Sequence, residues 1–88
     1  MGQDIEKEVI EMLSKMTGFE PSEIKPNMII AKDLGVDSLK VIEIATAIEK
    51  KYKVLVKEKQ MTKIKTVNDS IKLIESLLRK KVNIRLIK

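Results

Sequence analysis

The chain has 88 residues, of which 43 % are hydrophobic and 35 % charged, a balance typical of one small folded domain. It contains no histidine and no cysteine, which excludes Ser-His triads, thiol catalysis, disulfide frameworks and zinc fingers, and we expect no metal site. No apolar run approaches the roughly 20 residues that span a bilayer, and the start lacks the pattern of a secretory signal. The composition therefore predicts an intracellular, cytoplasmic protein.

Charge is distributed unevenly along the chain, whose formal net charge is +5. Residues 1–38 contain four lysines and eight acidic residues, whereas residues 39–88 contain fourteen basic and five acidic residues. Such asymmetry can mark a basic face that meets an acidic partner, nucleic acid or lipid headgroups. A solvated, lysine-rich surface is the simpler interpretation of any single cluster.

The first predicted helix lies near the start of the chain, between a capping Asp4 and a terminating Gly18. Its apolar residues recur at helical spacing: Ile5, Val9, Met12, Leu13 and Met16. Prolines and glycine then break the periodicity over residues 18–37, which predicts a long loop. This loop is rich in aliphatic residues and should pack over the helices, and residues 21–24 predict a single helical turn.

A second helix is predicted from Ser38, with an apolar stripe that includes Val41, Ile44, Ala45, Ile48 and Tyr52. The polar stretch after residues 54–56 has room for one short helix. Thr66 and Asp69 then form a T-x-x-D capping pattern before the last long helix. We predict an all-α fold, a small four-helix bundle of three long helices and one short, with the long loop between the first two. The domain covers residues 1–80, and residues 81–88 form a basic and aliphatic tail, either helical or extended.

Ser38 lies in the stretch DLGVDSLK, residues 33–40, at the expected start of the second helix. A serine there can cap the helix, but Asp37 can supply the same cap and leave the hydroxyl of Ser38 available. Nucleophilic catalysis would need a nearby base, and the chain has neither a histidine nor a G-x-S-x-G turn. A modified serine fits better, because an attached phosphodiester would sit at the positive end of the helix.

The stretch DLGVDSLK, followed by VIEIATAIEKKY, resembles the carrier-protein motif of acyl carrier proteins. The similarity continues through KIKTVNDSIKLIESL and covers roughly residues 4–78. It implies that Ser38 receives 4'-phosphopantetheine, covalently, from coenzyme A. Asp37 and Leu39 match the residues that the phosphopantetheinyl transferase reads. The thiol of the arm would hold acyl groups as thioesters, so the resemblance implies a carrier with no catalytic residues.

The same resemblance implies a monomeric carrier that delivers acyl intermediates to synthases, reductases, dehydratases and acyltransferases of fatty-acid or specialised lipid biosynthesis. A helical bundle of this kind shelters the acyl chain between its helices. Five residues are candidates to line that pocket, with ordinary core packing as the alternative: Ile44, Ala45, Ile48, Ile64 and Val67.

The second helix departs from the family pattern in its charge. Typical free-standing carriers present carboxylates there to basic patches on their partners, whereas this chain has a lysine two residues after Ser38. We expect docking through Lys40, Ile42 and Glu43, and partners other than the ordinary fatty-acid enzymes, because like charges repel.

Two further classes of function remain open from the sequence. Within the family, the chain could carry polyketide, aminoacyl or D-alanyl groups. Outside it, a basic helical module could bind nucleic acid or an anionic membrane. The scarcity of arginine and aromatic residues argues against nucleic acid, which we do not expect as a partner. Weak contact with anionic membranes through the tail RKKVNIRLIK is the more credible secondary property.

Overall fold

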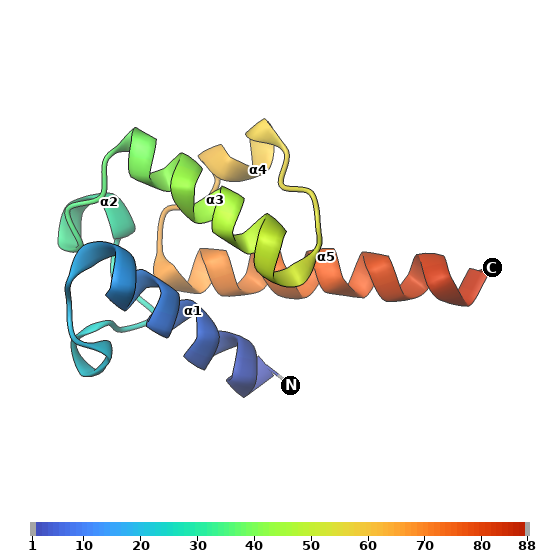
Figure 1. The fold of residues 1–88 in the computed structure, drawn as a ribbon, viewed down its shortest axis with the longest axis horizontal. Coiled ribbons are helices and arrows are strands. Elements are labelled where there is room, and N and C mark those ends of the chain that lie inside the picture. Colours follow the sequence, from blue (N-terminus) through green and yellow to red (C-terminus); the bar gives the residue numbers. More distant parts are fainter. Residues whose placement is uncertain (1, 88) are drawn as a thin grey trace.

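The protein is described by a computed structural model that covers residues 2–87, with side chains described for residues 5–80. Within this range all regular elements are helical (Figure 1). In chain order they are α1 (Gly2–Thr17), the 3-10 helix η1 (Pro21–Glu23), α2 (Ile30–Asp33), α3 (Ser38–Tyr52), α4 (Glu58–Thr62) and α5 (Val67–Ile87). The predicted small all-α bundle is confirmed, with α1, α3 and α5 as the long helices.

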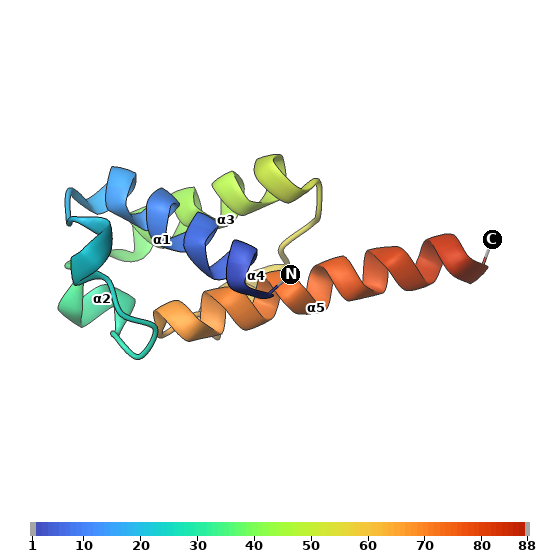
Figure 2. The same cartoon turned by 90° about the horizontal axis from the view of Figure 1, so that it is seen from below.

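The three long helices surround one aliphatic core. α1 and α3 both lie beside the first half of α5, whose second half projects beyond them (Figures 1 and 2). The core is closed at its centre, since Val9, Leu13 and Ile74 are all 0 % exposed. The other buried apolar residues come from every part of the chain between α1 and α5: Ile24, Ile30, Leu34, Val36, Ile44, Ala45, Ile48, Val56, Ile64, Val67 and Ile71.

The long loop between α1 and α3 packs over the bundle, as its aliphatic content predicts. Its backbone is fastened to the start of α5, where the amide of Ile30 donates to the carbonyl of Lys65 (2.8 Å) and the amide of Val67 to that of Met28 (3.0 Å). The helical turn expected over residues 21–24 is present as η1. The sequence missed α2, because four residues give too short a periodic signal. There the Asp33 carboxylate accepts the amide of Ile29 (2.8 Å) and caps the turn.

The expected capping pattern at the start of the last helix is confirmed. The Asp69 carboxylate accepts the amide of Thr66 (3.0 Å), while the Thr66 hydroxyl accepts the amide of Asp69 (3.0 Å). These bonds, led by the one from the Thr66 amide, lower the pKa of Asp69 below 3.8. At the other end, the backbone of α5 remains helical to Ile87, which answers the question of whether the tail is helical or extended.

The side chains of residues 81–88 lie outside the described part of the chain. The membrane contact expected of them therefore stays a prediction, as does the division into residues 1–80 and 81–88. Across the described residues, no helix combines the length and the apolar character that a bilayer crossing requires.

Candidate functional site

The start of α3 leaves the Ser38 hydroxyl available. Asp37 adopts the extended backbone of an N-cap residue, and its Oδ1 accepts the amide of Lys40 at 2.9 Å. The side chain that caps the helix is therefore Asp37 and not Ser38. Ser38 is the first residue of the helix and is exposed.

The segment before Ser38 is anchored to the core and then turned outward. Leu34 and Val36 are each 4 % exposed, and the amide of Val36 donates to the carbonyl of Ile30 (3.3 Å). Between them Gly35 has a φ of 65°, in the left-handed region that favours glycine. The two buried side chains thus fix the position from which Asp37 and Ser38 emerge at the surface.

Ser38 lies on the rim of an open hollow of about 420 Å³ between α2, the start of α3 and α4. Its lining is mostly apolar and comes from three helices and two connections: Ala31, Val36, Asp37, Ser38, Val41, Ile42, Glu58, Met61, Thr62 and Ile64. The wall formed by α4 has no buried residue. An apolar group attached at Ser38 therefore finds apolar surface within reach.

The five predicted pocket residues divide into two groups. Ile64 lines the hollow beside Ser38. The other four, Ile44, Ala45, Ile48 and Val67, form part of the closed core behind it and are 0–3 % exposed. Sequence analysis missed Val36 and Met61 as lining residues, because they stand on other elements and the spacing within α3 carries no information about the facing wall.

The three predicted docking residues lie on different sides of α3. At 100° per residue, Ile42 shares the flank of Ser38, Lys40 lies on the opposite flank and Glu43 lies between them. Ile42 accordingly lines the hollow beside Ser38, and it is 51 % exposed. Leu39, predicted to be read by the transferase, is 70 % exposed. The helix thus presents an exposed apolar pair next to Ser38.

The far end of α3 is held by two glutamates. The hydroxyl of Tyr52 donates to Glu8 of α1 at 2.6 Å, and burial together with that carboxylate raises the pKa of Tyr52. The Glu49 carboxylate accepts the amide of Val56 at 2.9 Å and so fastens the connection to α4. Among the residues whose side chains are described, no group of three or more acidic residues is placed to hold a metal ion.

Comparison with known proteins identifies this arrangement. A profile of the family described as "Phosphopantetheine attachment site" matches residues 7–75, which include Ser38 and the hollow. An acyl carrier protein of a Sulfurovum species is 36 % identical over 84 % of this chain and 93 % of its own. A meromycolate extension acyl carrier protein of Mycolicibacterium aurum is 36 % identical over 85 % of this chain and 77 % of its own.

The match to other meromycolate carriers covers less of the relative. For that of Mycobacterium tuberculosis H37Rv the identity is 38 %, over 78 % of this chain and 60 % of the relative's length. Among solved structures, the acyl carrier protein of Thermotoga maritima superposes with a TM-score of 0.77 at 22 % identity, over 90 % of this chain and 92 % of its own. The chain therefore belongs to the acyl carrier protein family, whose members carry phosphopantetheine and are not enzymes.

Proposed function

We propose that Ser38 is the residue to which 4'-phosphopantetheine is attached, and that the loaded chain carries acyl groups for lipid assembly. The observation that carries the proposal is that Asp37, and not Ser38, caps the start of α3. Asp37 makes the capping bond to the Lys40 amide, so the exposed hydroxyl of Ser38 can be esterified without loss of the cap. The backbone N–H groups and positive dipole end of α3 favour the anionic phosphodiester there.

The residues around Ser38 fit the group. When bound, it supplies the thiol on which an acyl chain is held as a thioester. Asp37 and Leu39 flank Ser38 and are both exposed, so a transferase can approach them directly. The hollow beside Ser38 offers apolar surface from Val41, Met61 and Ile64.

We propose that this hollow is the entrance through which an acyl chain reaches the core. The α4 wall has no buried residue, so displacing it exposes little apolar surface and costs little free energy. Behind it lie Ile44, Ala45, Ile48 and Val67, the core residues expected to line an occupied pocket. A bound chain would replace part of the contacts within this buried cluster.

The pathway we favour is the assembly of long-chain or specialised lipids. Its support is the similarity to carriers named for meromycolate extension, at 36–38 % identity. In this role the chain, as a cytoplasmic monomer, would deliver acyl groups to synthases, reductases, dehydratases and acyltransferases. Delivery of polyketide, aminoacyl or D-alanyl groups is the alternative within the family.

The attachment is tested by incubating the protein with coenzyme A and a broad-specificity phosphopantetheinyl transferase, followed by intact mass measurement. One added arm is expected on the wild type and none on Ser38→Ala. Ser22→Ala, which removes another exposed serine, should still be loaded. Modification of the Ser38→Ala protein, or none of the wild type, would overturn the proposal.

A further inference from the structure

The hollow beside Ser38 is the first of three that adjoin one another across α3. A second hollow of about 320 Å³ lies over the outer face of the helix and shares Ile42 with the first. A third, of about 480 Å³, lies between α1 and α3 and shares Ala47 and Lys50 with the second. Together they form a shallow path that starts beside Ser38. We call this path, lined by Ile42, Glu43, Thr46, Ala47, Lys50 and Lys51, the α3 track.

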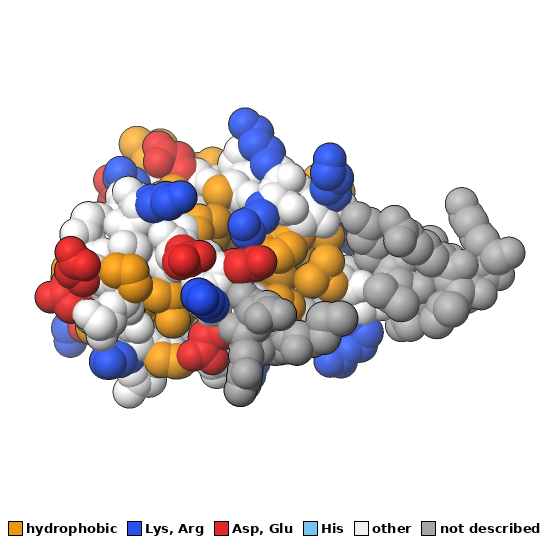
Figure 3. Space-filling model, turned by 60° about the horizontal axis from the view of Figure 1, so that its bottom comes forward, with side chains coloured by type: hydrophobic (Ala, Val, Ile, Leu, Met, Phe, Trp, Pro, Cys, Tyr) orange, Lys and Arg blue, Asp and Glu red, His pale blue; other side chains and the backbone are white. Residues whose placement is uncertain are grey.

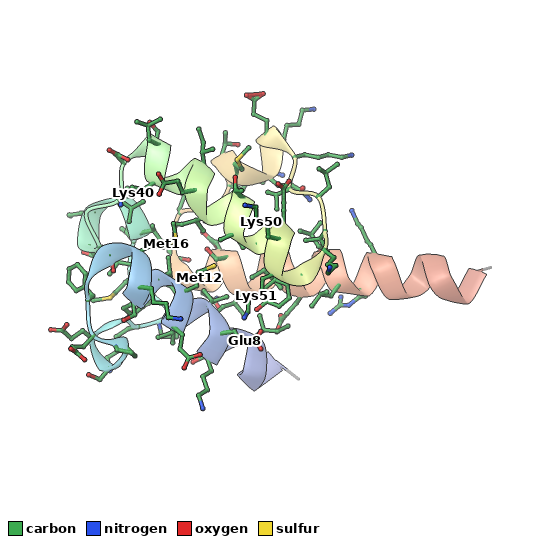
Figure 4. All side chains as sticks on the ribbon, viewed as in Figure 1. Glu8, Met12, Met16, Lys40, Lys50 and Lys51 are labelled. Carbon is green, nitrogen blue, oxygen red and sulfur yellow. The ribbon has the colours of Figure 1, made fainter. Side chains whose placement is uncertain are left out.

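Where the third hollow lies between α1 and α3, the floor of the track suits contact with another protein. Met12 of α1 lines the third hollow opposite Ala47, whose small side chain leaves the space open. Figure 4 shows Met12 and Met16 on the side of α1 that faces α3, between Lys40 near one end of α3 and Lys51 near the other. Methionine side chains are flexible and polarizable, so they adapt to an incoming apolar side chain.

Three exposed lysines line the third hollow: Lys15 from α1, and Lys50 and Lys51 from α3. We call them the basic end of the track. Two glutamates line the same hollow, but Glu8 already accepts the Tyr52 hydroxyl at 2.6 Å. The Glu8 carboxylate keeps its charge, so the lining of the third hollow has a net charge of +1, but its exposed charged side chains are the three lysines and Glu11.

The acidic residues of α3 do little to offset this charge. Glu49 accepts the amide of Val56 on the flank away from α1, so Glu43 alone contributes a carboxylate to the track. Lys40 adds a further positive charge on the α1 flank. Figure 3 shows one side of the molecule, on which acidic and basic side chains are interspersed. Basic residues outnumber acidic ones over residues 39–88 as a whole, and the α3 track is the part of this excess that adjoins the hollow beside Ser38.

From these observations we infer that the α3 track is a docking surface for an acyl-processing enzyme whose docking rim carries carboxylates. The inference rests on the proposed function, because the partner must reach the arm on Ser38. Leu39 and Ile42 contact it beside the attachment site, and its acidic side chains lie against the basic end. An enzyme with the usual basic rim meets Lys15, Lys50 and Lys51 instead and is repelled. Complementary rim charge acts mainly on the rate of association and on the choice of partner.

The test uses a β-ketoacyl synthase whose docking rim is rich in lysine and arginine. It is compared with a variant of the same synthase in which the lysines and arginines of the rim are replaced by glutamate. The carrier is first loaded at Ser38 with a pantetheine analogue that alkylates the active-site cysteine of the synthase, and loading is verified by mass. We expect the wild-type carrier to cross-link to the acidic-rim synthase about tenfold faster than to the basic-rim one, and less so at high salt.

The carrier variant Lys15→Glu, Lys50→Glu, Lys51→Glu should reverse that preference. Glutamates near the end of α3 oppose its dipole, so the corresponding triple glutamine variant is measured as well. It should lose the preference without reversing it, with circular dichroism as the check on folding.

A matched control changes three exposed lysines away from the track by the same charge: Lys7→Glu, Lys25→Glu and Lys65→Glu. It should retain the wild-type preference. Rates within twofold for the two synthases, or equal effects of the two triple glutamate variants, would overturn the inference while Ser38 loading stands. Failure to load Ser38 would instead overturn the proposed function, and the docking inference with it.

Discussion

The two sides of the core differ in how deeply their residues are buried. We call the first side, the packed pair of helices α1 and α5, the frame, and the second side, α4, the wall. In the frame, Val9, Leu13 and Ile74 are completely buried, and α1 packs chiefly against α5. On the other side α4 has five residues, none of them buried, and Met61 is only half-buried against the core. The open hollow and Ser38 lie beside this wall.

This contrast suits a carrier that must keep its fold while it takes up and releases a chain. Buried apolar area sets the cost of separating two elements, so the frame resists opening and α4 yields. Because the weaker wall is also the one next to Ser38, the proposed attachment there would let a chain enter without disturbing the α1–α5 contact.

Truncation of one apolar side chain on each side tests the contrast directly. Leu13→Ala leaves a cavity in the frame and should lower the free energy of unfolding by about 3 kcal/mol. Met61→Ala removes half-buried contacts from the wall and should cost about 1 kcal/mol. Urea denaturation of the apo-protein measures both.

The Met61→Ala variant should also change acyl exposure, unlike Leu13→Ala. With an acyl chain loaded on Ser38, we expect the thioester of the Met61→Ala protein to be hydrolysed faster than that of the wild type. Equal losses of stability in the two variants would show that the frame and the wall do not differ in the way described.

A substitution at Gly35 tests how Ser38, the proposed attachment site, is positioned. Its φ of 65° is unfavourable for a residue with a Cβ, although a Cβ there would meet no atom within 4 Å. Gly35→Ala should therefore cost about 1–2 kcal/mol through the backbone alone. Gly35→Asn should cost less, because asparagine tolerates this conformation. Thermal unfolding of the two variants measures the difference, and equal losses would point to a cause other than φ.

The sequence was informative wherever the signal was local. Helical spacing located α1, α3 and α5, and the T-x-x-D pattern predicted the bonds between Thr66 and Asp69. It predicted less about the site, because a hollow is made by residues distant in the chain. Nothing in the stretch from Ser38 to Tyr52 shows that Met61 faces it, or that Glu49 is bonded to the loop. The charge of the α3 track depends on such bonds and required the structure.

The connection between α4 and α5, where Asp69 bonds to Thr66, is predicted to contribute less to stability in acid. The lowered pKa of Asp69 means that the folded protein binds its proton more weakly than the unfolded chain does. Its contribution to stability is complete above the ordinary value of 3.8 and is lost as the pH falls through the lowered one. Asp69→Asn should cost about 1 kcal/mol near pH 7, with a smaller difference from wild type near pH 2.

Urea denaturation across this pH range measures the effect, and Glu6→Gln controls for the loss of one exposed carboxylate away from this connection. A difference between wild type and Asp69→Asn that does not shrink below pH 3.8 would contradict the role given to the Asp69 carboxylate.

The smallest change in the free energy of unfolding is expected at Ser70, a buried polar residue within the frame. Ser70 of α5 is 0 % exposed, and its hydroxyl has no hydrogen-bond partner among the described residues. Ser70→Ala should therefore stabilise the protein, by about 0.5–1 kcal/mol, since a buried hydroxyl without a partner is costly to desolvate. Ser14→Ala is the matched control on α1, because the Ser14 hydroxyl donates to the carbonyl of Phe19 at 2.6 Å. It should destabilise the protein by about 1 kcal/mol. If Ser70→Ala destabilises the protein as Ser14→Ala does, the Ser70 hydroxyl has a hydrogen-bond partner in solution. The α1–α5 contact would then depend on a polar interaction as well as on apolar packing, and its contrast with the α4 wall would not be one of buried apolar area alone.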